Sequence, residues 1–250
     1  MFVGENLGEL FKRMGNSIKT DLQSTNEVHQ SLALALTGAL APKDLVEVVY
    51  NDVLTMAMTE SSRVTLFVRK KAILCLLRIF RKYKDKCQVT EKWPVAISAM
   101  LDQKSLGFLS AAVSLLNGVV YLSEPTGFEE CVPKLIRILY RLIIDKNYTQ
   151  DYLYYGTPNP WLLVKCLKGL QNFPPPDEEK HLLHINEVLT KIVTKTEVTK
   201  SVNKNNSDYG VLFEAINLII HYRLAINSEL RNQMQTRLGV FISVKEPNVR

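Results

Sequence analysis

The sequence has no long hydrophobic run, and it lacks a recognisable secretion signal. A membrane-spanning helix needs about 18 or more consecutive apolar residues, and the longest candidate, Leu135–Ile144, is interrupted by Arg137 and Arg141. The opening residues Met1–Glu5 do not show a basic stretch followed by an apolar one, which a secretory signal would require. We therefore expect neither a membrane-spanning segment nor a signal peptide.

Closely spaced cysteines are absent as well. The four cysteines lie far apart and form no Cys-x-x-Cys pair; they are Cys75, Cys87, Cys131 and Cys166. In a chain of this size, such spacing is typical of reduced thiols that pack inside a cytosolic protein. We therefore expect free, mostly buried cysteines and a cytoplasmic location.

Catalytic motifs are missing too. The sequence contains no P-loop, no dinucleotide-binding glycine motif and no nucleophile elbow. The closest pair of histidines, His181 and His184, has a spacing that can present two imidazoles to one metal ion, but no third ligand accompanies it. We expect no catalytic, cofactor-binding or metal-binding residues and no enzyme activity. A metal-dependent hydrolase that uses His181 and His184 is kept as an alternative.

The composition indicates a folded chain with a modest overall charge. Of the 250 residues, 46% are hydrophobic and 22% are charged, as in an average soluble domain. The 31 basic and 25 acidic residues give a net charge of +6. Spread over the whole chain, this charge is too small to indicate nucleic-acid binding.

Helical spacing of apolar residues dominates the sequence, and strict alternation is almost absent. About eleven helices are expected from period and punctuation, with starts at residues such as Asn26, Ser105, Pro160 and Ser228. Helix pairs recur at intervals of about 40 residues, which is the range of HEAT and armadillo repeats. The predicted fold is all-α: a HEAT/armadillo-like α-solenoid of helical hairpins, with an ordinary helical bundle as the alternative.

Local signals also predict individual helix starts, irregular segments and the placement of some aromatic residues. Helices are predicted to begin at about Val64 after Ser61 and Ser62, at Pro125, at Ser207 or Asp208, and again at Pro247. Irregular segments are predicted over 145–160 and 196–208, the second because it is polar and rich in asparagine. Trp161 is expected to be the first core residue of its helix, and the tyrosines of 152–155 to anchor a loop.

Positive charge is concentrated between Arg63 and Lys86. This segment holds nine basic residues and one acid, Asp85, so that its net charge is +8. At about 100° per residue, six of the basic residues fall within one arc of about 120° on a helix, together with Phe67 and Leu74. We call these six the basic strip: Arg63, Lys70, Lys71, Arg78, Arg81 and Lys82.

The basic strip has two interpretations. It is a solvated helix face, paired with acids such as Glu47 and Asp52, or it binds an anionic surface such as a membrane leaflet with phosphoinositide headgroups. Nucleic acid is possible electrostatically, but no nucleic-acid-binding motif accompanies the strip. If the strip binds lipid, replacing Arg69 and the helical strip residues by Glu is expected to abolish liposome binding and to leave the helical CD spectrum intact.

Three stretches of the sequence together resemble a known family: Val68–Arg81, Pro160–Asp177 and Val211–His221. They resemble helices in the large subunits of clathrin adaptor complexes, the adaptins. The second stretch, which starts Pro-Trp-Leu and ends Pro-Pro-Pro-Asp, looks specifically like the alpha-adaptin branch. Their order and spacing agree with the family, and Ile18–Leu22 with Leu32–Leu40 resembles the repeat upstream.

The resemblance implies an α-solenoid trunk. Residues 1–250 are expected to be a single trunk segment, a middle fragment truncated at both ends relative to the family, since Pro247 opens a further helix. The implied role is non-enzymatic scaffolding in endocytic vesicle formation, with the beta, mu and sigma subunits as partners and clathrin as an indirect one. The implied location is cytoplasmic, peripheral on the cytosolic face of the plasma membrane at coated pits.

No lipid-binding residue is carried over from the family, so the basic strip is an independent hypothesis. The alternative function is a HEAT-type transport receptor or a nucleic-acid-binding solenoid, in which the surroundings of Lys70 would meet RNA or an acidic peptide. Under the adaptor interpretation, no nucleic-acid partner is expected.

Overall fold

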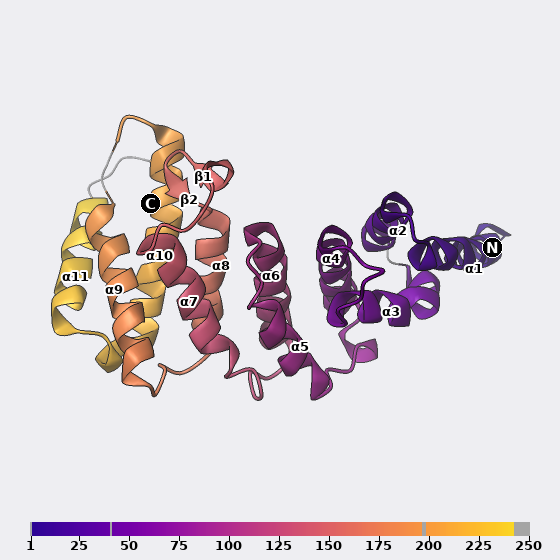
Figure 1. Cartoon of the computed structure of the whole chain (residues 1–250), viewed down its shortest axis with the longest axis horizontal. Helices are drawn as coiled ribbons and strands as arrows, with labels where there is room; N and C mark the ends of the chain where they lie inside the picture. Colours follow the sequence, from indigo (N-terminus) through magenta and orange to yellow (C-terminus); the bar gives the residue numbers. More distant parts are fainter. Residues whose placement is uncertain (1, 41, 197–198, 243–250) are drawn as a thin grey trace. The chain divides into compact units, whose positions relative to one another are not determined.

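The computed structural model describes residues 2–40, 42–196 and 199–242 (Figure 1). Nearly all of the regular structure in these ranges is helical. In chain order the helices are α1 (Phe2–Gln23), α2 (Glu27–Leu40), α3 (Lys43–Met58), α4 (Leu66–Lys82), α5 (Lys92–Met100), α6 (Leu106–Leu122), α7 (Cys131–Ile143), α8 (Pro160–Leu170), α9 (Glu179–Lys195), α10 (Val202–Tyr222) and α11 (Ser228–Ile242).

Three 3-10 turns and one small β-ribbon complete the described structure. The turns are η1 (Lys84–Lys86), η2 (Gln150–Tyr152) and η3 (Arg223–Ala225), and the strands are β1 (Leu153–Tyr154) and β2 (Thr157–Pro158), which pair antiparallel. None of the described helices combines the length and the apolar character that crossing a bilayer would demand.

Side-chain caps explain where several helices begin. The Asn26 side chain accepts a hydrogen bond from the backbone N–H of Val28 at 2.9 Å, just before α2. Ser105 caps α6 in the same way through the N–H of Phe108 at 3.4 Å. Each cap satisfies one of the backbone donors that a helix leaves unpaired in its first turn.

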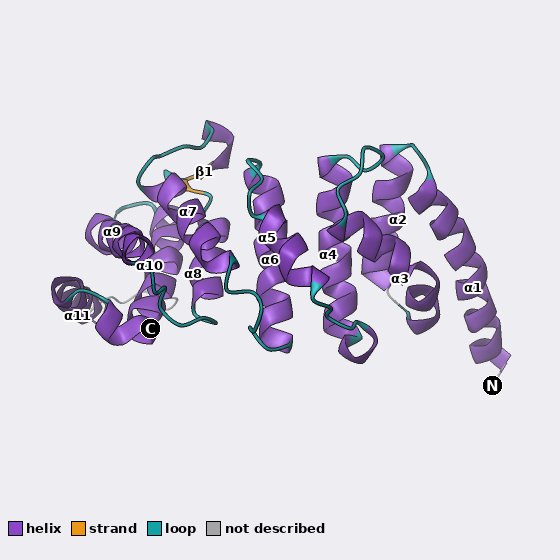
Figure 2. Cartoon of the chain, turned by 60° about the horizontal axis from the view of Figure 1, so that its bottom comes forward, coloured by secondary structure: helices purple, strands orange, loops and turns teal. Residues whose placement is uncertain are grey.

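The N-terminal unit (Met1–Glu124) is built from three helical hairpins. Within it α1 packs on α2, α3 on α4, and α5 on α6. Alternate helices also pack on one another, which gives one layer of α1, α3 and α5 and a second layer of α2, α4 and α6 (Figure 2). Repeated stacking of hairpins in two layers is the construction of an α-solenoid.

The C-terminal unit (Pro125–Arg250) is built in the same way. Here α7, α9 and α11 pack in one layer, and α8 packs on α10 in the other. The β-ribbon lies between α7 and α8 in the chain, and β2 packs against α10. The fold class expected from the sequence is confirmed in both units, whereas the treatment of residues 1–250 as one trunk segment stays a prediction.

Apolar side chains fill both units, and the four cysteines belong to these cores. All four are free and buried, as predicted. Burial raises the pKa of the Cys75 thiol and of the Cys131 thiol to about 12, and the nearby cations Arg78 and Lys134 only partly offset this. A thiol with such a pKa is almost entirely protonated near neutral pH, so these side chains act as small apolar groups.

Two helix starts were predicted too early, each for a local reason. α4 begins at Leu66 rather than at about Val64, because Thr65 is the residue that accepts the capping hydrogen bond from Val68. α7 begins at Cys131 rather than at Pro125, after a turn in which Gly127 has a φ of 90°. The helix expected at Pro247 lies outside the described residues.

The start of α10 was predicted too late. Ser201 caps the helix through the N–H of Lys204, so the asparagine-rich stretch that was expected to be a loop is helical from Val202. The Asn205 side chain also bonds back to Thr199, accepting from its N–H at 2.9 Å and donating to its carbonyl at 2.7 Å. Polar side chains that favour loops in isolation here stabilise a helix start.

The segment 145–160 contains the β-ribbon, which the sequence did not predict. Its turn places Tyr155 at φ 49° and Gly156 at φ 86°, the left-handed conformations that a two-residue hairpin turn requires. Trp161 is 58% exposed rather than buried in the core. Its ring packs edge-on against Tyr154 at 4.9 Å, so it covers the ribbon from outside.

Gly38 in α2 offers a test of the packing between α2 and α4. A Cβ at this position would lie 3.7 Å from the Cα of Cys75, an ordinary contact distance. Because glycine weakens a helix interior, Gly38→Ala is expected to raise the free energy of unfolding by about 0.5–1 kcal/mol, measured by urea denaturation.

Gly118 in α6 is the contrasting position. A Cβ there would lie 2.3 Å from Cδ1 of Leu77, so Gly118→Ala must displace that buried side chain and is expected to gain less stability than Gly38→Ala or to lose some. A Gly38→Ala variant that is less stable than the native chain would contradict the described packing.

Candidate functional site

α4 is surrounded by other helices on most of its circumference. It packs against α2, α3 and α6 within the N-terminal unit. Its apolar side is buried completely at Val68, Ile73 and Leu76, for example. The side left to solvent carries basic and apolar residues together, because three neighbouring helices cover everything else.

Five of the six strip residues lie on this exposed side of α4. Lys70 and Lys71 are half-buried and place their ammonium groups over the ring of Phe67, at 5.2 and 5.4 Å from its centroid. Arg78 and Arg81 are exposed about two and three turns further on. These cations therefore share one helix face, and an aromatic ring at its start gathers two of them.

Lys82, the last residue of the basic strip, contacts the end of α2. Its Nζ lies 3.5 Å from the carbonyl oxygen of Leu40 at the end of α2, and 5.4 Å from the centroid of the Tyr83 ring. A lysine that approaches the last carbonyl of a helix interacts favourably with the negative end of the helix dipole. Lys82 thus contributes to the contact between α4 and α2.

Arg63 does not lie on the helix, contrary to the sequence prediction. It precedes the cap Thr65 and occupies a turn, where its backbone N–H donates to the Ser61 hydroxyl at 3.3 Å. Its side chain is exposed. The predicted arc placed Arg63 with the others because the helix was expected to start earlier than it does.

Arg69 faces the interior, so its place in the charge-reversal set was wrong. Its side chain is only 6% exposed, and its Nε donates a hydrogen bond to the carbonyl oxygen of Ala57 at 3.2 Å. The guanidinium also lies over the Phe108 ring, 5.5 Å from the centroid. Burial lowers the pKa of Arg69, an effect that the nearby charge of Glu60 partly offsets. Arg69 joins α3, α4 and α6.

Asp52, one of the two acids proposed as strip partners, contacts α1 instead. The Asp52 carboxylate receives Lys19 at 3.8 Å and the amide of Gln23 at 3.3 Å, both from α1. Among the described residues, no carboxylate lies within salt-bridge distance of five strip residues: Arg63, Lys70, Lys71, Arg78 and Arg81. Their charges are therefore available to an outside partner.

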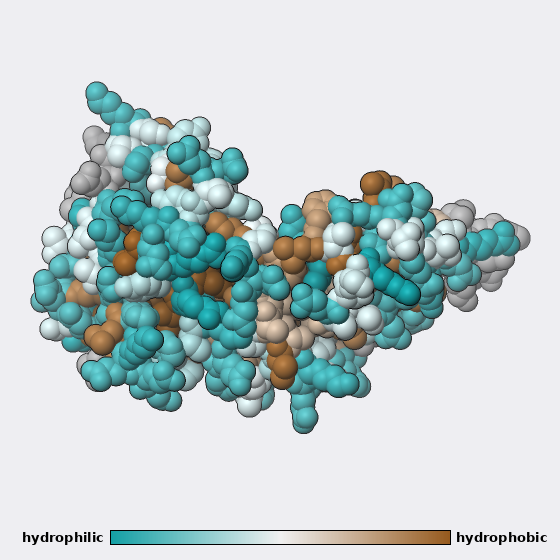
Figure 3. All heavy atoms as spheres, in the orientation of Figure 1, coloured by the Kyte–Doolittle hydropathy of each residue, from teal (hydrophilic) through white to brown (hydrophobic). Residues whose placement is uncertain are grey.

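α2 adds an apolar component that the sequence reading did not identify. Val28, Leu32 and Leu36 follow one another at intervals of four residues and are exposed, Leu32 by 70%. Phe67 and Leu74 of α4 are exposed as well. Figure 3 shows hydrophobic atoms reaching the surface over α2 and around α4. The four-residue spacing was the available signal, but spacing alone does not distinguish a buried stripe from an exposed one.

A shallow hollow connects the two helices. It has a volume of about 260 Å³ and is lined by Val28 and Leu32 from α2 and by Phe67 and Lys71 from α4, among others. We call the combined surface the α2–α4 face. It comprises Val28, Leu32, Leu36, Phe67 and Leu74 with the cations Lys70, Lys71, Arg78 and Arg81.

The histidine pair considered as a metal site is occupied by ordinary contacts. Nδ1 of His181 lies 3.3 Å from a carboxylate oxygen of Glu178, and the His184 ring packs on Tyr140 with centroids 4.5 Å apart. Across the part of the chain that the structure describes, no three His, Cys, Asp or Glu side chains are grouped to hold a metal ion.

Exposed apolar side chains beside cations that have no carboxylate partner among the described residues are typical of a surface that binds a partner. The stacked hairpins that present this face make the class of fold an α-solenoid. A designed armadillo repeat protein has a similar fold, with a TM-score of 0.52 at 12% identity over 93% of this chain and 94% of that one.

The sequence identifies the family within this fold class. Residues 6–250 match the adaptin N terminal region, and the chain belongs to the adaptin family. It is 40% identical over 235 residues to the AP-2 complex subunit alpha-1 of Arabidopsis thaliana, covering 94% of this chain and 23% of that protein. It is 36% identical over 245 residues to the AP-2 complex subunit alpha-2 of Dictyostelium discoideum, covering 97% of this chain and 24% of that protein. The chain thus spans about a quarter of the length of these curated relatives.

Arg69→Ala tests the division between inward and outward basic residues. The substitution leaves the buried carbonyl of Ala57 without its donor, so the free energy of unfolding is expected to fall by about 2–3 kcal/mol. Arg78→Ala, the matched change on the exposed side, should alter it by less than about 0.5 kcal/mol. Urea unfolding followed by CD measures both, and equal losses would refute the assignment.

Proposed function

We propose that this chain is a scaffolding segment of the large subunit of a clathrin adaptor in endocytic vesicle formation. Its membership of the adaptin family and its identity to AP-2 alpha subunits support this role. Adaptins are structural trafficking adaptors, so the role proposed is binding and not catalysis. The same relationship favours the adaptor over a transport receptor or a nucleic-acid-binding solenoid.

The α2–α4 face is the surface proposed to grip a partner subunit. Its five exposed apolar side chains lie on two neighbouring helices, with Leu32 70% exposed at the centre of the α2 stripe. Covering them gains about 25 cal/mol per Å² of apolar area removed from water. The surrounding cations would orient an acidic patch of the partner and reject basic surfaces. The exposed apolar stripe of α2 is the single observation that carries this proposal.

The proposed assembly is the adaptor heterotetramer. In it the beta, mu and sigma subunits are the partners, and clathrin is recruited indirectly. The proposed location is the cytosolic face of the plasma membrane at coated pits. The scaffold works because stacked hairpins hold the α2–α4 face in a fixed geometry, which reduces the ordering cost of binding.

Subunit co-purification tests the scaffold proposal. The chain is expected to retain at least one of the sigma, mu and beta subunits, and Leu32→Asp combined with Phe67→Asp is expected to abolish this retention, because both put a charge into the apolar contact. Val95→Asp is the matched control, since Val95 is 69% exposed on α5 in the other layer of the same unit.

The outcomes of this test are separable. Failure to retain any adaptor subunit would overturn the scaffold role. If the double variant keeps its α-helical CD spectrum and still retains a subunit, the scaffold role would stand, but the α2–α4 face would not be the docking surface.

Binding of the basic strip to an anionic membrane is the second candidate function. One observation favours it: five of the strip cations have no carboxylate partner among the described residues. Each basic group near an acidic leaflet contributes about 1 kcal/mol of attraction. The apolar side chains beside the cations, Phe67 and Leu74, could also enter the interfacial region of a bilayer.

Arg78→Glu with Arg81→Glu is the variant that tests lipid binding, because both side chains are exposed and Arg69 is left in place. Sedimentation with phosphoinositide liposomes should fall by at least about tenfold if the strip binds the leaflet. Lys92→Glu, a charge reversal at one exposed residue of α5, should have little effect. Unchanged sedimentation of the double variant would eliminate the lipid proposal.

A further inference from the structure

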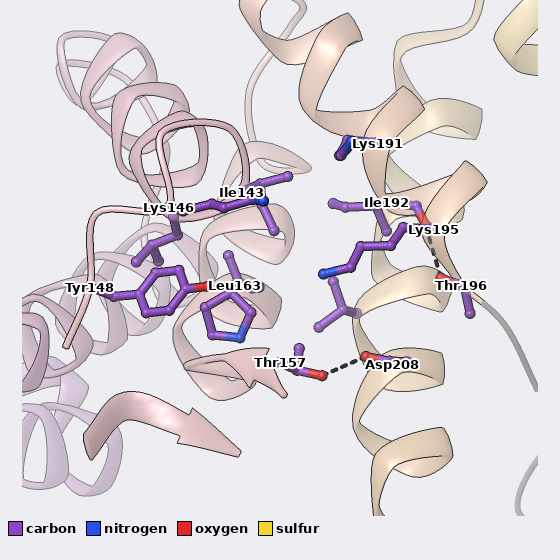
Figure 4. Close-up of a pocket in the computed structure, with 13 residues that line it drawn as sticks. Ile143, Lys146, Tyr148, Thr157, Leu163, Lys191, Ile192, Lys195, Thr196 and Asp208 are labelled. Carbon is purple, nitrogen blue, oxygen red and sulfur yellow. Dashed lines mark hydrogen bonds between the residues drawn. The ribbon is translucent and has the colours of Figure 1, made fainter. Parts of the chain in front are cut away.

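The C-terminal unit contains a pocket where the last turns of α7 and α9 meet the first halves of α8 and α10. The pocket has a volume of about 210 Å³. Its walls come from the end of α7 and the loop after it, from β2, from α8, and from α9 and α10 (Figure 4). None of the residues that line it belongs to the α2–α4 face.

The floor of this pocket is apolar. Leu142, Leu163, Ile192 and Val211 line it, and all four side chains are buried in the unit. The volume is below the about 300–1,000 Å³ that pockets for small-molecule ligands usually have. The floor therefore has room for one large apolar side chain rather than for a whole cofactor.

The rim of the pocket carries three lysines on two different walls. Lys146 belongs to the loop after α7, whereas Lys191 and Lys195 are on α9. Figure 4 shows the side chains of Lys146 and Lys195 extending into the space between these walls. Among the residues that the structure describes, no carboxylate lies within salt-bridge distance of any of the three lysines.

Asp208 lines the same pocket, but its charge is already matched. It accepts a hydrogen bond from the hydroxyl of Thr157, and it accepts another from Nζ of Lys204 at 3.0 Å. The carboxylate is therefore held away from the rim lysines by partners of its own. The field inside the pocket is set by Lys146, Lys191 and Lys195, and it favours an anion.

The loop that carries Lys146 is fixed by hydrogen bonds rather than by its own preference. Lys146 has a φ of 52°, a conformation that glycine or asparagine adopts more readily. The N–H of Asn147 donates to the carbonyl of Arg141 at 3.0 Å, and Nε of Arg141 donates back to the carbonyl of Asn147 at 3.3 Å. This pair of bonds holds the turn, so that Lys146 projects from a defined position.

We propose that this pocket binds a short acidic peptide segment of a partner protein, with one large apolar side chain in the floor and carboxylates on both sides of it. The carboxylates on one side reach Lys146, and those on the other side reach Lys191 and Lys195. This inference goes beyond the proposed scaffold and does not depend on it, because the two surfaces share no residue.

The apolar floor distinguishes this occupant from a phosphate group. A phosphorylated headgroup is strongly hydrated and gains nothing from an apolar pocket, whereas burying a leucine-sized side chain of the occupant contributes about 1.5–3 kcal/mol. Lysines on exposed rims add orientation and salt-dependent attraction. An acidic peptide with one apolar anchor uses both parts of the pocket.

Fluorescence anisotropy with the whole 250-residue chain tests the proposal. The probe is a labelled peptide with one leucine between three aspartates on either side. Saturable binding is expected, weakening as salt is raised from about 50 mM to about 500 mM. Lys146→Glu and Lys195→Glu should each weaken binding by about tenfold or more, and Lys195→Gln by less. Lys168→Glu is the matched control, because Lys168 is exposed on α8 outside the pocket.

Four results would overturn the proposal. They are the absence of saturable binding, equal binding of a peptide with alanine in place of leucine, binding that the Lys146 and Lys195 variants do not change, and binding of inorganic phosphate or phosphoinositide vesicles at these lysines in preference to the peptide. CD spectra of the variants establish that they remain folded, and Lys195→Gln keeps the test valid if a charge reversal at Lys195 or Lys146 disturbs the local structure.

Discussion

Burial of α4 on three sides is the constraint on which the N-terminal unit depends. With α2, α3 and α6 packed around it, this helix has one narrow side left for solvent. Basic residues are sorted by that constraint: Arg69 points inward and finds the carbonyl of Ala57 and the ring of Phe108, whereas Arg78 and Arg81 point outward. The basic residues of α4 thus serve two purposes: Arg69 stabilises the packing of α3, α4 and α6, and Arg78 and Arg81 form part of an exposed surface.

The α2–α4 face combines two features that have different physical roles. In the proposed contact, the exposed leucines and the phenylalanine supply contact area, and the cations, which have no carboxylate partner in the described part of the chain, orient the partner. Neither feature would define a partner alone, because isolated surface apolar residues are common and surface lysines are usually solvated. Their coincidence on two packed helices is the basis for proposing a docking surface there, and membership of the adaptin family is the basis for proposing an adaptor subunit as its partner.

Helix existence and type were predictable from the sequence, because the apolar period and caps such as Asn26 and Ser105 are local signals. Positions that depend on tertiary packing were not. The helical wheel set Arg69 apart from the strip but could not show that its guanidinium is buried against α3 and α6. The exposed stripe of α2 and the lysine-rimmed pocket were missed for the same reason: each is assembled from several segments that are distant in sequence.

Hydroxyl-radical footprinting of the chain, alone and with the adaptor sigma, mu and beta subunits, measures side-chain exposure directly. If the α2–α4 face is the docking surface, oxidation of Leu32, Phe67 and Leu74 should fall sharply in the complex, while oxidation of Val95 stays unchanged. Equal oxidation of Leu32, Phe67 and Leu74 in the free and bound chain would contradict the claim that the α2–α4 face is the docking surface, because a docking surface loses solvent exposure when its partner binds.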